Sequence, residues 1–316
     1  MTLPDTPLVT CRVSINLCCY NSEEFLEETL QTIQAQTFTD WELVVINDGS
    51  TDSTEEIINR YARQDARIVH HSQQNIGLSR SRNRAIELSR GQFIAFIDHD
   101  DLWEPTHLEA QLNAFTDDRI GLVYTDRLNI QDDREHPICR MSEYLTPASG
   151  DVFFEIVAGV YINPSMAMVR KSVLDDVGLF DVSYHFVEEA DLFLRIARKY
   201  RFAYIDEPLT IYRYHEGNFS NRFVNQQAET LRFRAELLRC YPDIRERMPQ
   251  LEREWTFNYH ARYFRWYVST RNYVNAVWSL VLVGWQGLQA PKYACERLKA
   301  FLSRWSGKTP TADWLS

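Results

Sequence analysis

The 316-residue sequence lacks the features that mark several common classes of protein. It contains no Gly-x-Gly-x-x-Gly segment and no Walker loop, so the usual glycine-rich loops of dinucleotide and P-loop proteins are absent. Its six cysteines show neither a Cys-x-x-Cys pair nor zinc-ligand spacing, and we expect reduced, buried thiols. The longest apolar run, residues 276–285, is shorter than the ~20 residues that span a membrane.

Positive charge is also scarce. The formal net charge is −10, from 34 basic and 44 acidic side chains, and only five of the basic ones are lysines. Because an acidic surface repels a polyanionic backbone, we expect no nucleic-acid partner. Residues 1–7 have neither the basic nor the apolar region of a secretory signal, so we expect a cytoplasmic protein.

Apolar strands and amphipathic helices alternate along the first hundred residues. The pattern predicts strands over residues 13–18, 43–46, 68–69 and 93–97, with helices that begin near residues 23, 53 and 78. Continuous apolar strands alternating with helices are typical of a sheet covered on both faces. We therefore predict an α/β fold with a Rossmann-like, mostly parallel sheet flanked by helices.

The remainder of the chain is less regular. It predicts helices over 105–115 and 191–199, strands over 122–124 and 166–169, extended segments over 202–205 and 209–214, and a loop over 126–149. We expect one domain over residues 1–225, with halves of about 10–125 and 126–225, and a helical C-terminal region over 226–316. The aromatic residues of that region predict packing on the sheet domain, and peripheral contact with the inner face of a membrane stays open.

Polar side chains follow the predicted strands, where ligands bind in parallel sheets. Tyr20 and Asn21 follow the first strand and Asp48 follows the second. Asp98, His99, Asp100 and Asp101 follow the fourth directly. Three carboxylates so close together repel one another, so they are either solvated or held by a cation such as Mg²⁺ or Mn²⁺.

Eight short motifs occur in a fixed order over roughly residues 10–220. They are Val13-Ser-Ile-Asn with Tyr20-Asn21; Gln36-Thr-Phe-Thr-Asp-Trp-Glu-Leu; Val45-Ile-Asn-Asp-Gly-Ser-Thr-Asp; Asn75-Ile-Gly-Leu-Ser-Arg-Ser-Arg-Asn; Gly91-Gln-Phe-Ile-Ala-Phe-Ile-Asp-His-Asp-Asp; Gly178-Leu-Phe-Asp; Glu188-Glu-Ala-Asp-Leu; and Tyr212-Arg-Tyr-His. Each is weak alone, but eight in order are hard to obtain by chance. Together they resemble the motifs of a family 2 glycosyltransferase with the GT-A fold.

The resemblance implies a nucleotide-diphosphate sugar donor, usually a UDP-sugar, and inversion at the anomeric carbon. The hydroxyl acceptor would be a glycan, lipid-linked or other molecule in polysaccharide or glycoconjugate synthesis, and an oligomer stays open. By motif position, Asp48 matches the carboxylate that binds the base, and Arg82 matches an arginine near the diphosphate. The expected nucleotide-sugar-binding residues are Tyr20, Asn21, Asp48, Gly77, Arg82, Asp98 and His99.

The same resemblance implies a divalent metal, Mn²⁺ or Mg²⁺. Asp98 and Asp100 match the DxD motif, with Asp98 near the ribose and Asp100 on the metal. Asp101 is a further candidate ligand. His215 matches a histidine that approaches the metal or the pyrophosphate in some relatives, and an ordinary loop histidine is an equally good interpretation of it.

The candidate general base lies at the start of the helix predicted near residue 190. The family motif there is Glu-Asp, whereas this chain has Glu188-Glu189. Adjacent helical residues diverge by ~100°, so only one of the two can face the cleft. Motif position favours Glu189, with Glu188 and Asp191 as alternatives. Simple charge complementation of the helix end is the competing interpretation.

Other functions also fit parts of the pattern. A phosphohydrolase of the haloacid-dehalogenase type places Asp-x-Asp after an apolar strand, but Leu102 stands where it would have Thr or Val. A nucleotidyltransferase would need a glycine-rich loop after the first strand. A nucleotide-sugar-binding module without turnover is the third alternative, which the exchange of Glu for Asp at position 189 keeps open.

Overall fold

The computed structural model describes residues 11–131, 137–143, 145–158, 160–215, 223–248 and 251. Contacts divide the chain into two compact units, residues 1–234 and 235–316. The expected boundary, between residues 225 and 226, precedes this division by a few residues. The aromatic helices expected further along, and the membrane contact considered for them, lie outside the described residues.

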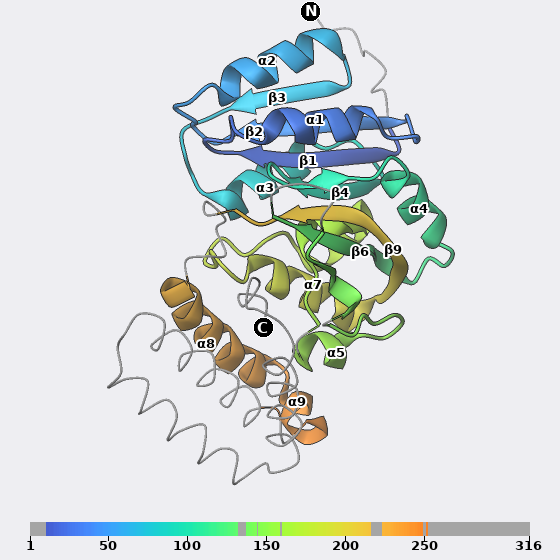
Figure 1. Ribbon diagram of the computed structural model, residues 1–316. Helices are drawn as coiled ribbons and strands as arrows, with labels where there is room; N and C mark the ends of the chain where they lie inside the picture. The colour runs from blue at the N-terminus through green and yellow to red at the C-terminus, as the bar shows by residue number, and fades with distance from the viewer. Residues whose placement is uncertain are drawn as a thin grey trace, which may run out of the picture. The chain divides into compact units, whose positions relative to one another are not determined.

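The first half of the sheet is parallel and follows the predicted alternation. Its strands are β1 (Val13–Cys19), β2 (Trp41–Asn47), β3 (Ile68–Ser72) and β4 (Phe93–Asp98), and its helices are α1 (Leu26–Gln34), α2 (Thr54–Gln64) and α3 (Leu78–Leu88). The strands lie in the order β3-β2-β1-β4, with β1 between β2 and β4 (Figure 1).

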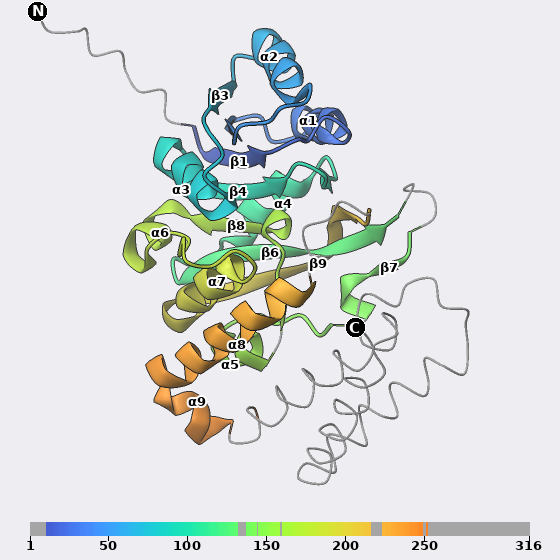
Figure 2. The same ribbon diagram turned by 90° about the vertical axis from the view of Figure 1, so that its left-hand side faces the viewer.

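Alternate residues of β2 explain why both faces of this sheet are covered. Leu43 and Val45 join the cluster that contains α1 and α2 side chains, whereas Val44 and Ile46 pack with Ala85 of α3. Figure 2 shows α1 and α3 on opposite sides of the sheet. The predicted α/β fold with helices on both faces is therefore confirmed.

The second half of the chain extends the sheet in the order β4-β8-β6-β9-β5, with β7 paired to β6. Its elements, in chain order, are β5 (Leu102–Trp103), α4 (His107–Ala114), β6 (Ile120–Ile130), β7 (Cys139–Arg140), the 3₁₀ turn Met141–Glu143, α5 (Phe153–Ala158), the 3₁₀ turn Pro164–Met166, β8 (Ala167–Arg170), α6 (Lys171–Val177), α7 (Glu188–Lys199) and β9 (Arg201–Arg213). The helices α8 (Phe223–Cys240) and α9 (Pro242–Arg247) follow.

Pairing in the second half is mixed, which the strand–helix alternation did not predict. β8 is antiparallel to both β4 and β6, and among the described strands of this half only β6 and β9 pair in parallel. The two extended segments predicted over 202–214 form the single strand β9. Its pairing with β6 shifts register beside Pro208, a residue with no N–H to donate.

The loop predicted over residues 126–149 was wrong in two places, because β6 continues to Ile130 and because β7 and a 3₁₀ turn occupy residues 139–143. The polar side chains that suggested a loop are buried and hydrogen-bonded. Asn129 Nδ2 donates to the Cys139 carbonyl at 3.1 Å, and the completely buried Asp126 pairs with Arg140 at 2.7 Å. Hydropathy does not register a polar residue whose partner lies on another element.

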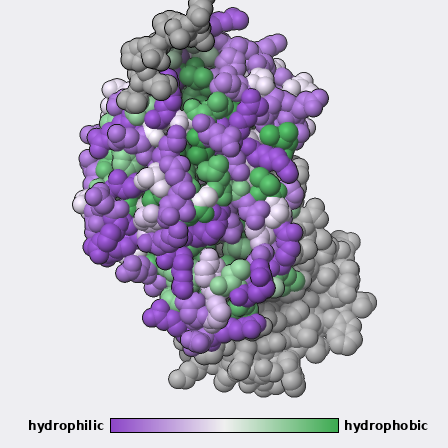
Figure 3. Space-filling model, turned by 180° about the vertical axis from the view of Figure 1, so that it is seen from behind, coloured by the Kyte–Doolittle hydropathy of each residue, from purple (hydrophilic) through white to green (hydrophobic). Residues whose placement is uncertain are grey.

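Polar residues dominate the described surface seen in Figure 3, with apolar ones interspersed. The large apolar side chains that are exposed, such as Val69, Leu88 and Val182, come from separate elements. Among the described helices, none combines the length and the apolar character that crossing a bilayer requires.

Glu42 joins the amino ends of three neighbouring strands. Its carboxylate, in a residue only 3% exposed, accepts hydrogen bonds from Ser14 Oγ at 2.6 Å and from the backbone N–H of Arg90 at 2.7 Å. Ser14 Oγ accepts in turn from Gly91 N–H at 2.8 Å. Burial raises the pKa of Glu42, but the hydrogen bonds from Ser14 and Arg90 outweigh it and leave that pKa below its ordinary value.

The substitution Glu42→Gln should reduce the free energy of unfolding at neutral pH by ~1–3 kcal/mol, because it removes the buried charge that accepts hydrogen bonds from Ser14 and Arg90. With its folded-state pKa lowered, ionised Glu42 stabilises the protein fully above its ordinary pKa of 4.5, and this contribution is lost as the pH falls through the folded-state pKa. The difference between wild type and variant in urea unfolding should therefore shrink in acid.

Glu27→Gln is the matched control, because the Glu27–Arg60 pair lies on the surface with both side chains about half exposed. Its effect should stay below ~1 kcal/mol. A Glu42 effect no larger than this control, or one that does not change with pH, would contradict the role given to the Glu42 carboxylate.

Candidate functional site

The parallel register brings the predicted strand-end residues to one edge of the sheet. Cys19 at the end of β1 lies beside Asn47 of β2, and Cys18 lies beside Asp98 of β4. The turns that follow these strands therefore begin at the same edge. This edge therefore carries Asp98, which ends β4, and Asp48, which follows β2.

Asp48 is buried beneath the loop that leads into α3. Its Oδ1 accepts hydrogen bonds from Gln73 Nε2 at 2.8 Å and from Ile76 N–H at 2.9 Å, and its Oδ2 accepts from Gly77 N–H at 2.9 Å. Gly77 has a φ of +90°, which favours glycine, and it precedes the first turn of α3. No local motif marked Gln73, because its partner Asp48 is 25 residues away.

Tyr20 and Asn21 lie beside this loop and differ in their contacts. The Tyr20 side chain is 49% exposed. Asn21 adopts a φ of +50°, and its Oδ1 accepts a hydrogen bond from Thr51 N–H at 2.9 Å. Asn21 therefore joins the turn after β1 to the turn after β2, while Tyr20 leaves a ring available at the surface.

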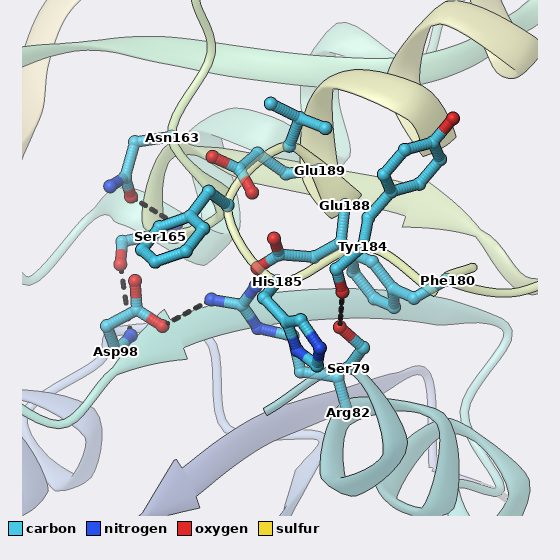
Figure 4. A network of polar contacts seen from close by, with 12 residues as sticks. Ser79, Arg82, Asp98, Asn163, Ser165, Phe180, Tyr184, His185, Glu188 and Glu189 are labelled. Carbon is cyan, nitrogen blue, oxygen red and sulfur yellow. Dashed lines mark hydrogen bonds and ion pairs between the residues drawn. The ribbon is translucent and has the colours of Figure 1, made fainter. Parts of the chain in front are cut away.

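Arg82 of α3 connects β4 to α7. Its Nη2 donates to Asp98 Oδ1 at 2.7 Å, and its Nη1 donates to Glu188 Oε1 at 2.9 Å (Figure 4). The Arg82 and Glu188 side chains are 6% and 4% exposed, against 28% for Asp98. Burial lowers the pKa of Arg82, but the charges of Asp98 and Glu188 outweigh it and raise that pKa, so Arg82 stays charged.

A serine of the second half also fixes Asp98. Ser165 Oγ accepts from Asp98 N–H at 3.0 Å, and Ser165 N–H donates to Asn163 Oδ1 at 2.8 Å. Trp103 Nε1 donates to the Ser165 carbonyl at 2.7 Å. Asp98 is thus held at two points, its carboxylate by Arg82 of α3 and its backbone N–H by Ser165 of the second half.

Thr29 of α1 holds the turn that carries the other acidic residues. Its hydroxyl donates to the carbonyls of His99, at 2.8 Å, and Asp101, at 2.9 Å. Asp100 Oδ2 lies 3.0 Å from His215 Nε2. The structure therefore brings His215, more than a hundred residues further along, next to the second carboxylate of the pair.

Asp100 and Asp101 have opposite electrostatic surroundings. Burial raises the pKa of Asp100, but the hydrogen bond from His215 and the nearby imidazoles outweigh it and lower that pKa. Asp101 is completely buried, and burial together with the charges of Asp100 and Asp98 raises its pKa well above its usual value. Asp100 is thus the better anionic ligand of the two. Within the described residues, no group of three His, Cys, Asp or Glu side chains is assembled for a metal.

The three candidate bases on α7 contact different partners, as expected from their divergence around a helix. Glu188 binds Arg82, whereas Glu189 Oε1 accepts from the Tyr161 hydroxyl at 3.3 Å. Asp191 pairs at 2.8 Å with Arg195, which gives Asp191 a structural partner on its own helix. Burial and the charge of Glu188 raise the pKa of Glu189 well above its ordinary value.

Two residues of the second half, Tyr161 and Arg127, were missed by the sequence reasoning. Tyr161 is 41% exposed and bonds to Glu189. Arg127 of β6 is 5% exposed, and its guanidinium carbon lies 4.5 Å from the ring centroid of Tyr212 and 5.9 Å from that of Tyr161. Arg127 fell in the segment predicted as loop, and no motif marked Tyr161.

Comparison with known proteins gives the family. The profile described as Glycosyl transferase family 2 matches residues 14–178. TuaG of Bacillus subtilis (strain 168), whose name refers to teichuronic acid biosynthesis, is 33% identical over 114 residues, which cover 36% of this chain and 45% of TuaG. The uncharacterized glycosyltransferase MJ1057 of Methanocaldococcus jannaschii is 30% identical over 233 residues, covering 71% of this chain and 77% of that protein. The chain spans less than half the length of the first curated relatives it matches.

Two solved structures share the fold. The S. aureus TarS 1-349 fragment in complex with UDP-GlcNAc matches 72% of this chain and 66% of its own with a TM-score of 0.57 and 19% identity. The mannosyltransferase PcManGT from Pyrobaculum calidifontis, in complex with GDP-Man and Mn²⁺, matches 96% of this chain and 82% of its own with a TM-score of 0.62 and 17% identity. The predicted GT-A type fold is confirmed. Because the family profile covers more than half of its residues, the chain belongs to glycosyltransferase family 2.

Proposed function

We propose that this protein transfers a sugar from a nucleotide-diphosphate sugar, of which a UDP-sugar fits best, to a hydroxyl group of an acceptor with inversion at the anomeric carbon. The observation that carries the proposal is the Arg82 bridge. Arg82 binds both Asp98, which lies where the diphosphate is proposed to bind, and Glu188. Glu188 is the neighbour in sequence of Glu189, the proposed general base. Among the structural neighbours, TarS was solved with UDP-GlcNAc and PcManGT with GDP-Man.

The Asp48 carboxylate is the proposed binding site for the nucleobase of the donor. Oδ1 already accepts two hydrogen bonds and Oδ2 accepts one, so Oδ2 retains capacity for one more donor. A carboxylate selects a base with an N–H at its pairing edge, as uracil has and adenine N1 lacks. The exposed ring of Tyr20 adds a surface on which a base can stack.

The Asp98 and Asp100 side chains suit a hard divalent cation such as Mn²⁺ or Mg²⁺. Such ions commonly bind one or two carboxylates and complete their coordination with substrate phosphates and water, so the lack of a third protein ligand among the described residues is compatible with this site. Asp100 has the lowered pKa that keeps it anionic, and His215 beside it orients the carboxylate. When bound, the cation supplies positive charge to the departing nucleoside diphosphate.

Glu189 is the proposed general base. It must take the proton of the acceptor hydroxyl on the face of the sugar opposite the leaving group, which accounts for inversion by a single displacement. Its raised pKa makes it a stronger base than an ordinary glutamate. The Tyr161 hydroxyl donates to Glu189 Oε1 and so orients the carboxylate.

Family membership sets aside the phosphohydrolase and nucleotidyltransferase alternatives. An experiment must still distinguish an active transferase from a nucleotide-sugar-binding module without turnover. The acceptor is proposed to be a glycan or glycan carrier, by analogy with TuaG. Peripheral membrane contact and oligomerisation stay predictions.

Glu189→Gln should lower the transfer rate by ~10²–10⁴-fold, because an amide cannot take the acceptor proton. The dissociation constant of UDP in the presence of Mn²⁺ should change less than about twofold, since the substitution leaves the proposed nucleotide contacts in place. Release of UDP from a panel of UDP-sugars, with calorimetry for UDP, measures both quantities.

The matched control is Glu24→Gln, at an exposed position in the turn before α1. It should leave both quantities unchanged. Unchanged turnover in Glu189→Gln would remove Glu189 from the base role, and UDP binding without turnover by the wild type would favour the binding module.

Asp100→Asn should abolish the gain in UDP affinity that Mn²⁺ provides, because the amide loses the charge that attracts the cation. A thermal-shift titration with UDP, with and without Mn²⁺, reads this directly, since stabilisation by a bound ligand follows mass action. The exposed Asp151→Asn should keep the Mn²⁺ effect. Metal-dependent stabilisation that survives in Asp100→Asn would mean that the cation binds elsewhere.

A further inference from the structure

One carboxylate oxygen holds the loop that leads into α7. Glu229 of α8 presents its Oε1 to three consecutive backbone N–H groups, those of His185 at 2.8 Å, Phe186 at 2.6 Å and Val187 at 3.1 Å. Hydrogen bonds to an ionised acceptor are stronger than those between neutral groups. Glu229 thus fixes the backbone of all three residues before the helix begins.

The start of α7 has no cap of its own. Its N-cap residue, Val187, offers no side-chain hydrogen bond, and Ser, Thr, Asp or Asn usually stands at this position. Glu188 and Glu189 are the first two residues of the helix. An N-cap side chain would bind the N–H groups of the first helical turn, whereas Glu229 binds those of residues 185–187, so it fixes the backbone just ahead of a helix that has no side-chain cap.

Arg232 and Phe233, two residues of α8 near Glu229, also contact this loop. Arg232 Nη2 donates to the Ser183 carbonyl at 2.7 Å, and its guanidinium carbon lies 4.8 Å from the ring centroid of Tyr184. Phe233 meets the same ring edge-on, with centroids 5.7 Å apart. Residues 229, 232 and 233 follow the i, i+3, i+4 spacing of one helix face.

The opposite anchor of the loop is α3. Ser79 Oγ donates to the Tyr184 carbonyl at 2.9 Å, as Figure 4 shows, and Asn83 exchanges two hydrogen bonds with the backbone of Phe180. The helix α3 also carries Arg82, which binds Glu188. The loop from Phe180 to Val187 is therefore held between the helix of the Arg82 bridge and α8.

We propose that Glu229 is a positioning residue for sugar transfer: it holds the loop 185–187 so that α7 presents Glu189 to the acceptor. This inference rests on the role proposed for Glu189. A displacement of ~1 Å at a reacting group can cost about a hundredfold in rate, so a loop that relaxes without its acceptor is expected to slow the reaction. Both α7 and α8 lie outside the residues 14–178 that the family profile matches.

Hydrogen exchange tests the holding of the loop without any substrate. In Glu229→Ala, the amides of His185, Phe186 and Val187 should exchange at least about tenfold faster than in wild type, because they lose their acceptor. Glu236→Ala, which removes a surface glutamate from the same helix, should leave their exchange unchanged. Unchanged exchange in Glu229→Ala would overturn the proposal, whatever the enzyme proves to transfer.

Turnover tests the consequence for Glu189. Release of UDP from UDP-glucose, UDP-galactose and UDP-N-acetylglucosamine should fall about tenfold or more in kcat in Glu229→Ala, while the dissociation constant of UDP with Mn²⁺ stays within about twofold. Glu229→Gln keeps an acceptor oxygen and should recover part of both the rate and the slow exchange. Faster exchange with undiminished kcat would overturn the positioning role, whereas a wild type inactive on all donors would contradict the proposed function and leave the exchange result to judge the loop.

Discussion

A buried guanidinium that binds two carboxylates from distant parts of the chain is the interaction on which the site depends. Arg82 draws Asp98, at the end of β4, and Glu188, at the start of α7, to one point. Removing one partner of such a buried group leaves an uncompensated charge, which typically costs ~3–5 kcal/mol. The bridge therefore fixes the position of Asp98, at the proposed cation site, relative to that of α7, which carries the proposed general base Glu189.

The other polar groups of the site work around this bridge. The Asp48 carboxylate accepts a hydrogen bond from Gly77, the N-cap residue of α3, and so fixes the start of the helix that carries Arg82. Asp100 meets His215, which comes from the segment after β9. The residues proposed to bind the nucleotide and the cation thus come from separate segments of the sequence.

Local sequence signals predicted the first half well and the second half poorly. Continuous apolar strands and strand-end acids marked β1, β2 and β4 and the residues that follow them, because each of these signals lies within a few residues. Asp126 and Asn129 of β6 were predicted as loop because their partners, Arg140 and Cys139, lie on another element, β7. Tyr161 and Glu229 carry no local mark at all, since their roles come only from contacts with Glu189 and with the loop before it.

The most direct measurement of the central claim is a crystal structure of the protein with UDP and Mn²⁺. The account predicts that the cation binds Asp100, that the diphosphate lies at the end of β4 and that the nucleobase lies at Asp48. It also predicts that Arg82 still binds Glu188 and that Glu189 faces the space beside the diphosphate. A cation or a nucleotide bound at another surface, or Arg82 released from Glu188 with Glu189 turned away, would contradict it.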